Sequence, residues 1–131
     1  MPDAIITDLT LTALQRALDG TALQQRTIAG NIANLETPGY VARHVSFQES
    51  LRAALAAQHA GRAGADELLA AAGPAVGRDP TPPSEPDGNN VDIEREMTEL
   101  SEAGLRYEAL VRLVRRKFQM LGTAIGDGRQ A

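Results

Sequence analysis

The sequence predicts an all-α protein whose two long helices, one toward each end of the chain, pack as an antiparallel coiled-coil-like pair. Two observations support this prediction. Apolar residues recur at alternating spacings of three and four over about residues 8–35 and again over about 92–125, which is the pattern of a coiled-coil seam. The 131 residues also include only two Phe, two Tyr and no Trp, so Leu, Ile and Val at helical spacing must supply most of the packing.

The first predicted helix runs from about Asp8 to Leu35. Its two seam positions hold six large apolar residues and two polar ones. In chain order these are Leu11, Leu14, Leu18, Thr21, Gln25, Ile28, Ile32 and Leu35. A helix of this length spans roughly 40 Å, which is more than a small globule requires. We therefore expect its seam to be buried against the second long helix or against other chains.

A short middle helix is predicted to begin at Ser46 and to fade near Ala60. Ser46 and Glu49 fit a capping box, in which each side chain accepts a hydrogen bond from an otherwise unpaired backbone N–H. Phe47, Leu51 and Leu55 then share one face of the helix.

The segment from 61 to 90 has a different composition. It holds five of the seven prolines of the chain, and only Leu68, Leu69 and the neighbouring alanines favour a helical turn. We predict an irregular Pro/Gly-rich loop. It is either a plain linker or a loop that orders only against neighbouring subunits, and composition favours the linker. The chain is accordingly divided into an N-terminal helical segment (1–60), a flexible loop (61–90) and a C-terminal helix (91–131) that completes a single domain.

The last predicted helix, from about Asp92 to Ile125, has the longer seam. Only a glycine interrupts it. In order, the seam residues are Met97, Leu100, Gly104, Tyr107, Val111, Val114, Phe118, Leu121 and Ile125. Acidic residues crowd its start, with Asn90 or Asp92 as N-cap, and Gly126 and Gly128 are expected to end it.

Catalytic and metal-binding patterns are missing from the sequence. There is no Cys, the two His have no partner at ligand spacing, and no HExxH, GxSxG, P-loop or GxGxxG motif occurs. The stretch from Asp87 to Asp92 lacks the alternating ligands and closing Glu of a calcium loop, so a turn before a helix is the better interpretation. We expect no enzyme activity, no cofactor and no metal site.

Charge and hydropathy restrict the partners. The net charge of −4 argues against nucleic acid as the main partner. A basic cluster is formed by Arg112, Arg115, Arg116 and Lys117. Its simplest interpretation is a solvated helix face; docking onto an acidic neighbour ranks second and nucleic-acid binding third. No window reaches the roughly 18 apolar residues of a membrane span, and we expect no cleaved signal peptide. The chain is thus predicted to stay in the cytoplasm or to leave it without such a peptide.

The stretch GNIANLETPGY, residues 30–40, explains how the first helix ends. Pro38 disfavours helical geometry before it, and Pro38-Gly39 suits the centre of a type II turn. Asn31 and Asn34 lie on one helical face, where their amides can bond a backbone or cap the helix end. Gly30 costs about 1 kcal/mol relative to Ala in a helix, which close packing against another helix could offset.

This stretch resembles the signature that ends the N-terminal helix in the axial proteins of the bacterial flagellum, the rod, hook and hook-associated proteins. Residues 33–40 match its Ala-Asn-x-x-Thr-Pro-Gly-Tyr pattern. Residues 87–125, with LRYEAL followed by KFQML, are similar to the C-terminal helix of the proximal rod members of that family. The resemblance covers about residues 13–40 and 87–125 and leaves 61–86 uncovered.

The resemblance implies a non-enzymatic subunit of the rod in the basal body. Such a subunit is exported unfolded by the flagellar type III apparatus without a cleaved signal peptide. It is then assembled into a helical tube that crosses the periplasm and transmits motor torque. The implied partners are the export gate, further copies of the chain, a FlgC-type rod subunit and a FliE-type rod-base adaptor, with no direct membrane insertion.

The residues expected to make subunit packing contacts fall into two groups. The seam group pairs Leu11, Leu14, Leu18, Ile28 and Ile32 with Leu100, Tyr107, Val111, Val114, Phe118 and Leu121. The second group, at the end of the first helix, contains Gly30, Asn31, Asn34, Thr37, Pro38, Gly39 and Tyr40. Periodicity alone equally supports a small soluble coiled-coil adaptor or regulator, and the basic cluster leaves open a nucleic-acid-binding protein.

Overall fold

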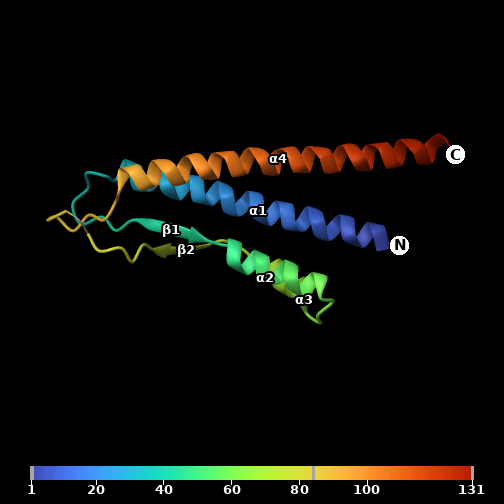
Figure 1. Ribbon diagram of the computed structural model, residues 1–131, viewed down its shortest axis with the longest axis horizontal. Coiled ribbons are helices and arrows are strands. Elements are labelled where there is room, and N and C mark those ends of the chain that lie inside the picture. Colours follow the sequence, from blue (N-terminus) through green and yellow to red (C-terminus); the bar gives the residue numbers. More distant parts are fainter. Residues whose placement is uncertain (1, 84, 131) are drawn as a thin grey trace.

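The computed structural model describes residues 2–83 and 85–130, of which 2–8, 129 and 130 are described by their backbone only. Six elements follow one another along the chain. They are α1 (Pro2–Ala33), β1 (Arg43–Ser46), α2 (Gln48–His59), α3 (Ala65–Ala71), β2 (Ala75–Arg78) and α4 (Ile93–Gln130). The molecule is elongated, with both chain ends toward one end, and the segments that join α1 to β1 and β2 to α4 lie at the other (Figure 1).

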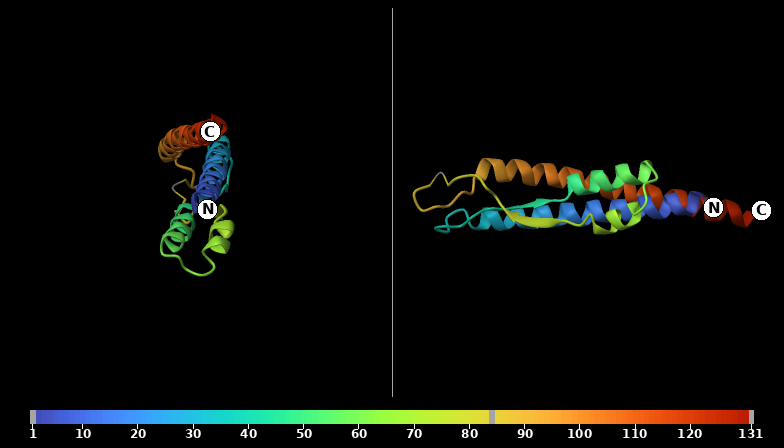
Figure 2. Two further views of the ribbon diagram at one scale, coloured as in Figure 1. Left: turned by 90° about the vertical axis from the view of Figure 1, so that its right-hand side faces the viewer. Right: turned by 90° about the horizontal axis from the view of Figure 1, so that it is seen from below.

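The long helices α1 and α4 run antiparallel and in contact, as predicted, and α1 is the central element. α4 lies along one side of it, whereas β1, α2 and α3 lie along the other (Figures 1 and 2). The chain is mostly helical, but the all-α prediction is wrong in one respect, because β1 and β2 form a small antiparallel sheet.

The sheet pairs Val45 with Val76 and Ser46 with Ala75. It shows that residues 61–90 are not wholly irregular, since this range contains both α3 and β2. The predicted helical turn around Leu68 and Leu69 is confirmed by α3. The strands were missed because each has only four residues, too few for a period of two to be read from sequence.

Several predicted helix ends are corrected. α1 ends at Ala33 rather than Leu35. The capping box at Ser46 is wrong, because Ser46 pairs in β1 and Phe47 takes the N-cap position of α2 without a side-chain cap. α4 does not end at Gly126 or Gly128 but continues to Gln130.

The seam between α1 and α4 is only partly buried within one chain. Ile28 of α1 and Ala103 of α4 are buried. Most of the other predicted seam residues are half-buried, namely Leu11, Leu14, Leu18, Ile32, Leu100, Val111, Val114 and Leu121. Two of the three residues that interrupt the seams meet each other, since a Cβ at Gly104 would lie 3.7 Å from Gln25 Nε2. Tyr107 and Phe118, however, are exposed.

A second apolar cluster lies on the opposite side of α1. Its buried members are Val45, Phe47, Leu51, Ala54, Leu69 and Ala72, and Leu9, Ala13, Ala17, Leu23 and Leu55 pack against them. The predicted face of Phe47, Leu51 and Leu55 thus contacts α1. The tightest point is Gly20, because a Cβ there would lie 2.6 Å from the ring of Phe47. Thr21, fully buried beside it, donates its hydroxyl hydrogen bond to Ala17 O at 2.7 Å.

The contact between Gly20 and Phe47 predicts that Gly20→Ala lowers the free energy of unfolding by about 1–3 kcal/mol, because the ring must move. Gly30→Ala is the matched control: a Cβ there meets nothing within 4 Å, so stability should stay the same or rise by up to about 1 kcal/mol. Urea unfolding followed by circular dichroism, in a stabilising osmolyte if the monomer is marginal, measures both. Equal effects of the two substitutions would contradict the close packing.

Candidate functional site

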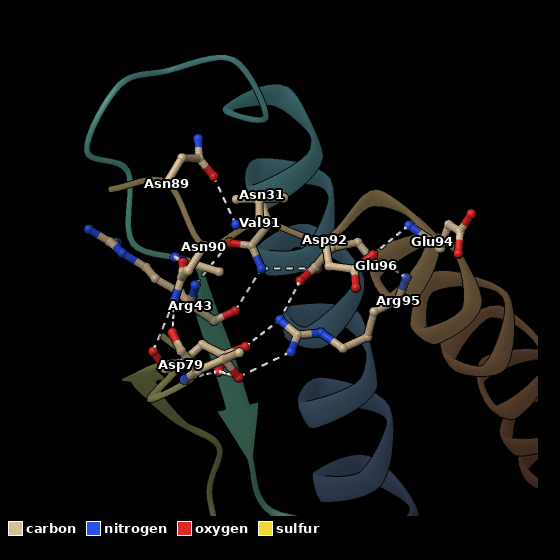
Figure 3. Close-up of polar contacts among 12 residues, drawn as sticks. Asn31, Arg43, Asp79, Asn89, Asn90, Val91, Asp92, Glu94, Arg95 and Glu96 are labelled. Carbon is tan, nitrogen blue, oxygen red and sulfur yellow. Dashed lines mark hydrogen bonds and ion pairs between the residues drawn. The ribbon is translucent and has the colours of Figure 1, made fainter. Parts of the chain in front are cut away.

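The candidate site is the end of the molecule where α1 stops and α4 begins (Figure 3). We call Asn31, Asn34, Asn89, Asn90 and Glu96 the polar corner. Asn31 and Asn89 are each only 1% exposed, and Asn90 and Glu96 are also buried. Burying polar side chains is costly unless they are hydrogen-bonded. Among the described residues, no buried side-chain nitrogen or oxygen lacks a hydrogen-bond partner.

Asn31 joins three elements through its amide. Its Nδ2 donates to Arg43 O at 2.7 Å and to Glu96 Oε2 at 3.0 Å. Its Oδ1 accepts from Arg43 N at 2.9 Å and from the Tyr40 hydroxyl at 3.2 Å. An amide has two N–H groups and two lone pairs, so Asn31 is fully used in holding the start of β1 and of α4 against the end of α1 (Figure 3).

Asn34 and Thr37 make side-chain hydrogen bonds at the C-terminal end of α1. The Asn34 amide donates to Gly30 O at 2.8 Å, and its Oδ1 accepts from the Thr37 hydroxyl at 3.1 Å. Tyr40 N then donates to Thr37 O at 3.2 Å and Gly39 has φ +72°, which confirms the predicted type II turn through Pro38-Gly39. Asn31 thus bonds the backbone of Arg43, and Asn34 bonds the carbonyl of Gly30 at the end of α1, both within the chain.

Asn89 closes the corner from the C-terminal half of the chain. Its Nδ2 lies within hydrogen-bond distance of three carbonyl oxygens, those of Asn34 (3.0 Å), Leu35 (3.0 Å) and Thr37 (2.8 Å). Its Oδ1 accepts from Val91 N at 2.8 Å. A helix end leaves its last carbonyls without helical partners, and Asn89 supplies donors where the chain leaves α1.

Asn90 fastens the loop before α4 to the chain that enters β1. Its Oδ1 accepts from Ala42 N at 2.6 Å, and its Nδ2 donates to Asp79 O at 3.2 Å and Thr81 O at 2.9 Å.

Asp92 is the N-cap of α4, because its Oδ1 accepts from the N–H groups of Glu94 and Arg95. It is one of the two residues predicted for that position. Sequence reasoning does not identify Asn89, although it predicts a turn for the stretch from Asp87 to Asp92 that contains it.

An ion pair borders the corner. Arg95 contacts Asp79 Oδ2 at 2.5 Å and donates to the Thr81 hydroxyl at 3.2 Å. Burial raises the pKa of Asp79, but hydrogen bonds from Thr81 and the Arg95 charge outweigh burial, so its pKa lies below the ordinary value. The pKa of Glu99 in α4 is raised by burial and by the neighbouring Glu96 carboxylate.

The structure brings the predicted corner residues together and leaves part of the predicted seam uncovered. Thr37, Pro38 and Gly39 lie exposed at the tip, and Tyr40 is half-buried. Gly30 makes no close approach to another helix of the same chain, so its expected packing partner is not found within the chain. Large apolar side chains are exposed along α4, namely Leu105, Leu113, Phe118, Met120 and Ile125.

Two observations concern metal sites and membrane spans in the described part of the chain. Its His, Asp and Glu residues form no group of three that could hold a metal ion. None of its helices is both long and apolar enough to cross a membrane.

Comparison with known proteins gives a consistent result. A family model described as flagella basal body rod protein matches residues 10–40, which include Asn31 and Asn34. The chain is 33% identical to the flagellar basal body rod protein FlgB of Bacillus subtilis (strain 168) over 123 residues, 92% of this chain and 95% of that protein. It is 34% identical to FlgB of Salmonella typhimurium (strain LT2), covering 77% and 81%, and 38% identical to FlgB of Cereibacter sphaeroides, covering 75% and 79%.

Asn89→Ala should lower the free energy of unfolding by about 2–4 kcal/mol, because it leaves the buried Val91 N–H without its acceptor and takes the side-chain donor away from the carbonyls that follow α1. Gln58→Ala serves as control, since it removes a hydrogen bond to Asp66 at an exposed site and should cost less than about 1 kcal/mol. Urea unfolding of both variants measures the difference. A loss at Asn89 no larger than at Gln58 would show that the corner does not stabilise the fold.

The ionised Asp79 should stabilise the fold above pH 3.8, its ordinary pKa. Because its folded-state pKa is lower, that contribution is lost as the pH falls below 3.8 and through the folded-state value. Asp79→Asn should therefore flatten the acid side of a plot of stability against pH. Glu99 should affect the pH dependence of stability in the opposite direction. Because its pKa is raised above 4.5 in the folded state, the fold should gain stability as the pH falls through that raised value. Glu99→Gln should remove this gain. Unchanged acid profiles would refute both assignments.

Proposed function

The chain belongs to the FlgB family of flagellar basal body rod proteins, and on that premise we propose that it works as a structural subunit of the proximal rod. The observation that carries the proposal is the match to a curated FlgB over 95% of that protein's length. The family is structural, and its members assemble with other rod components in the flagellar basal body. In this role the subunit would transmit motor torque as part of the drive shaft.

Exposed apolar side chains on two faces of α4 support a subunit that is completed by neighbours. Leu105, Leu113, Phe118, Met120 and Ile125 are each more than half exposed. Burying one such side chain contributes about 1.5–3 kcal/mol, so neighbouring helices that cover this surface would add strongly to stability. We propose that the chain gains much of its stability on assembly, as coupled folding and binding requires.

The polar corner supports the proposal in a second way. Its internal hydrogen bonds hold the tip formed by Thr37, Pro38 and Gly39 in one shape, while these residues stay exposed. We propose that this tip and the open backbone at Gly30 contact a neighbouring subunit. We propose also that neighbours cover the half-buried seam residues and the exposed Tyr107 and Phe118. Residues 1–60 and 91–131 would then form one axial domain, with 61–90 as its connecting segment.

Delivery and partners complete the proposal. The chain would leave the cytoplasm through the flagellar type III export gate as an unfolded polypeptide without a cleaved signal peptide. It would then contact further copies of itself, a FlgC-type rod subunit and a FliE-type rod-base adaptor. What supports these details is membership of the family together with an elongated fold whose apolar residues are incompletely buried.

Deletion of the gene should give basal bodies that have membrane rings but no rod, seen by electron microscopy of purified particles, and cells that do not swim. The wild-type gene should restore both. Intact rods in the deletion strain would refute the proposed function and favour a soluble adaptor.

Variants at the corner test its contact with neighbours. Asn34→Ala and Pro38→Ala should abolish swimming and rod completion while the protein is still made. Gly30→Ala is the sharper variant, because it is expected to fold at least as well as the parent chain and yet to reduce rod completion. Normal swimming of all three strains would show that the tip does not form a subunit junction.

A further inference from the structure

An apolar groove lies between α1, α2 and α4, away from the polar corner. Thr21 of α1 lies at its floor, Leu51 and Leu55 of α2 line one side, and Leu110 of α4 lines the other. Figure 2 shows α2 and α4 on either side of α1 when the molecule is viewed from the end. A groove bounded in this way by parallel or antiparallel helices has the shape that receives the apolar face of a further helix.

The charges around the groove are all of one sign. Arg52 of α2 and Arg106 of α4 line it, and His59, the last residue of α2, lies at its end. No carboxylate is among the described residues that line it. Arg106 donates to Gln24 at 3.3 Å, and Arg52 has only a distant ion pair to Glu49 within its own helix, at 3.9 Å and strongly exposed. Both guanidinium groups are therefore able to bind a carboxylate of a docked helix.

The exposed apolar face of α4 in another copy of this chain is a poor occupant. Its Leu105, Leu113 and Met120 are exposed, but by helical spacing they share that face with Arg112 and Arg116. Placing these cations beside Arg52 and Arg106 would bring like charges together, which disfavours the complex. The groove thus discriminates against the most apolar free surface of its own chain.

We propose that this groove binds an amphipathic α-helix of a different rod subunit, whose apolar stripe is flanked by carboxylates. The apolar residues would lie on Leu51, Leu55 and Leu110, and the carboxylates would pair with Arg52 and Arg106. This inference rests on the proposed function, because it takes the helix from a rod subunit. It adds the position of the contact and the chemistry of the partner.

Photo-crosslinking in assembled basal bodies tests the inference. Ala56 lines the groove and is exposed, whereas Ala53 is exposed on the same helix but does not line it. Each is replaced in turn by p-benzoylphenylalanine in the deletion strain, and the irradiated, purified basal bodies are digested and examined by mass spectrometry. We expect position 56, but not 53, to crosslink to a helix of another rod subunit that carries acidic residues beside an apolar stripe. If the bulk at position 56 prevents incorporation, the probe is placed at His59.

Two matched arginines test the charge. Arg52→Glu and Arg112→Glu each reverse an exposed arginine that pairs within its own helix at 3.9 Å, with 79% and 80% of the side chain exposed. Only Arg52 lines the groove. Arg52→Glu should lower the crosslink yield per incorporated subunit by about fivefold or more, and Arg112→Glu should leave it unchanged.

The failures of the two proposals look different. If the unaltered chain is absent from purified basal bodies, the proposed function is wrong. If the chain is present, three results would each overturn the groove proposal alone: equal crosslinking from positions 53 and 56, a crosslink to a second copy of this chain, or a partner helix without carboxylates.

Discussion

The fold depends on hydrogen bonds from asparagine side chains to the backbone where α1 ends. A long helix that stops and turns back exposes carbonyl and N–H groups that the helix no longer satisfies. Asn89 donates to the carbonyls just after α1, whereas Asn31 bonds both backbone groups of Arg43 where the chain returns as β1, and each asparagine is almost completely buried. Because one of them comes from the first helix and the other from the segment before the last, the same bonds that end α1 also fix where α4 begins.

The long helices and the shape of the first turn could be predicted because their signals are local. Seam spacing identifies α1 and α4, and Pro38-Gly39 identifies the type II turn. The sheet and the role of Asn89 could not, since both depend on residues far apart in sequence: Val45 pairs with Val76, and Asn89 reaches a carbonyl 55 residues earlier. The capping box at Ser46 failed for the same reason, because pairing with Ala75 competes with a local cap.

The apolar packing is divided between two sides of α1, and neither side is a large core. On one side small residues such as Ala103 and Gly104 let α4 approach α1. On the other, Gly20 lets the Phe47 ring lie directly on the helix. A molecule packed in two thin layers leaves helical faces unpaired, and in this chain those faces differ in charge: the free side of α4 is basic and apolar, and the groove beside α2 is apolar with arginines at its edge.

The long sequence separation within the polar corner also sets an order of events during synthesis. Asn31 cannot bond Glu96 until that residue, 65 positions later, has been synthesised. The carbonyls at the end of α1 likewise have no bond to Asn89 until Asn89 has been made. A ribosome delivers the N-terminal half first, so for much of translation α1 has no clamp at its end and no α4 beside it. Such late contacts delay compaction. The nascent polypeptide therefore stays uncompacted, and able to pass through a narrow channel, until nearly three quarters of it has been synthesised.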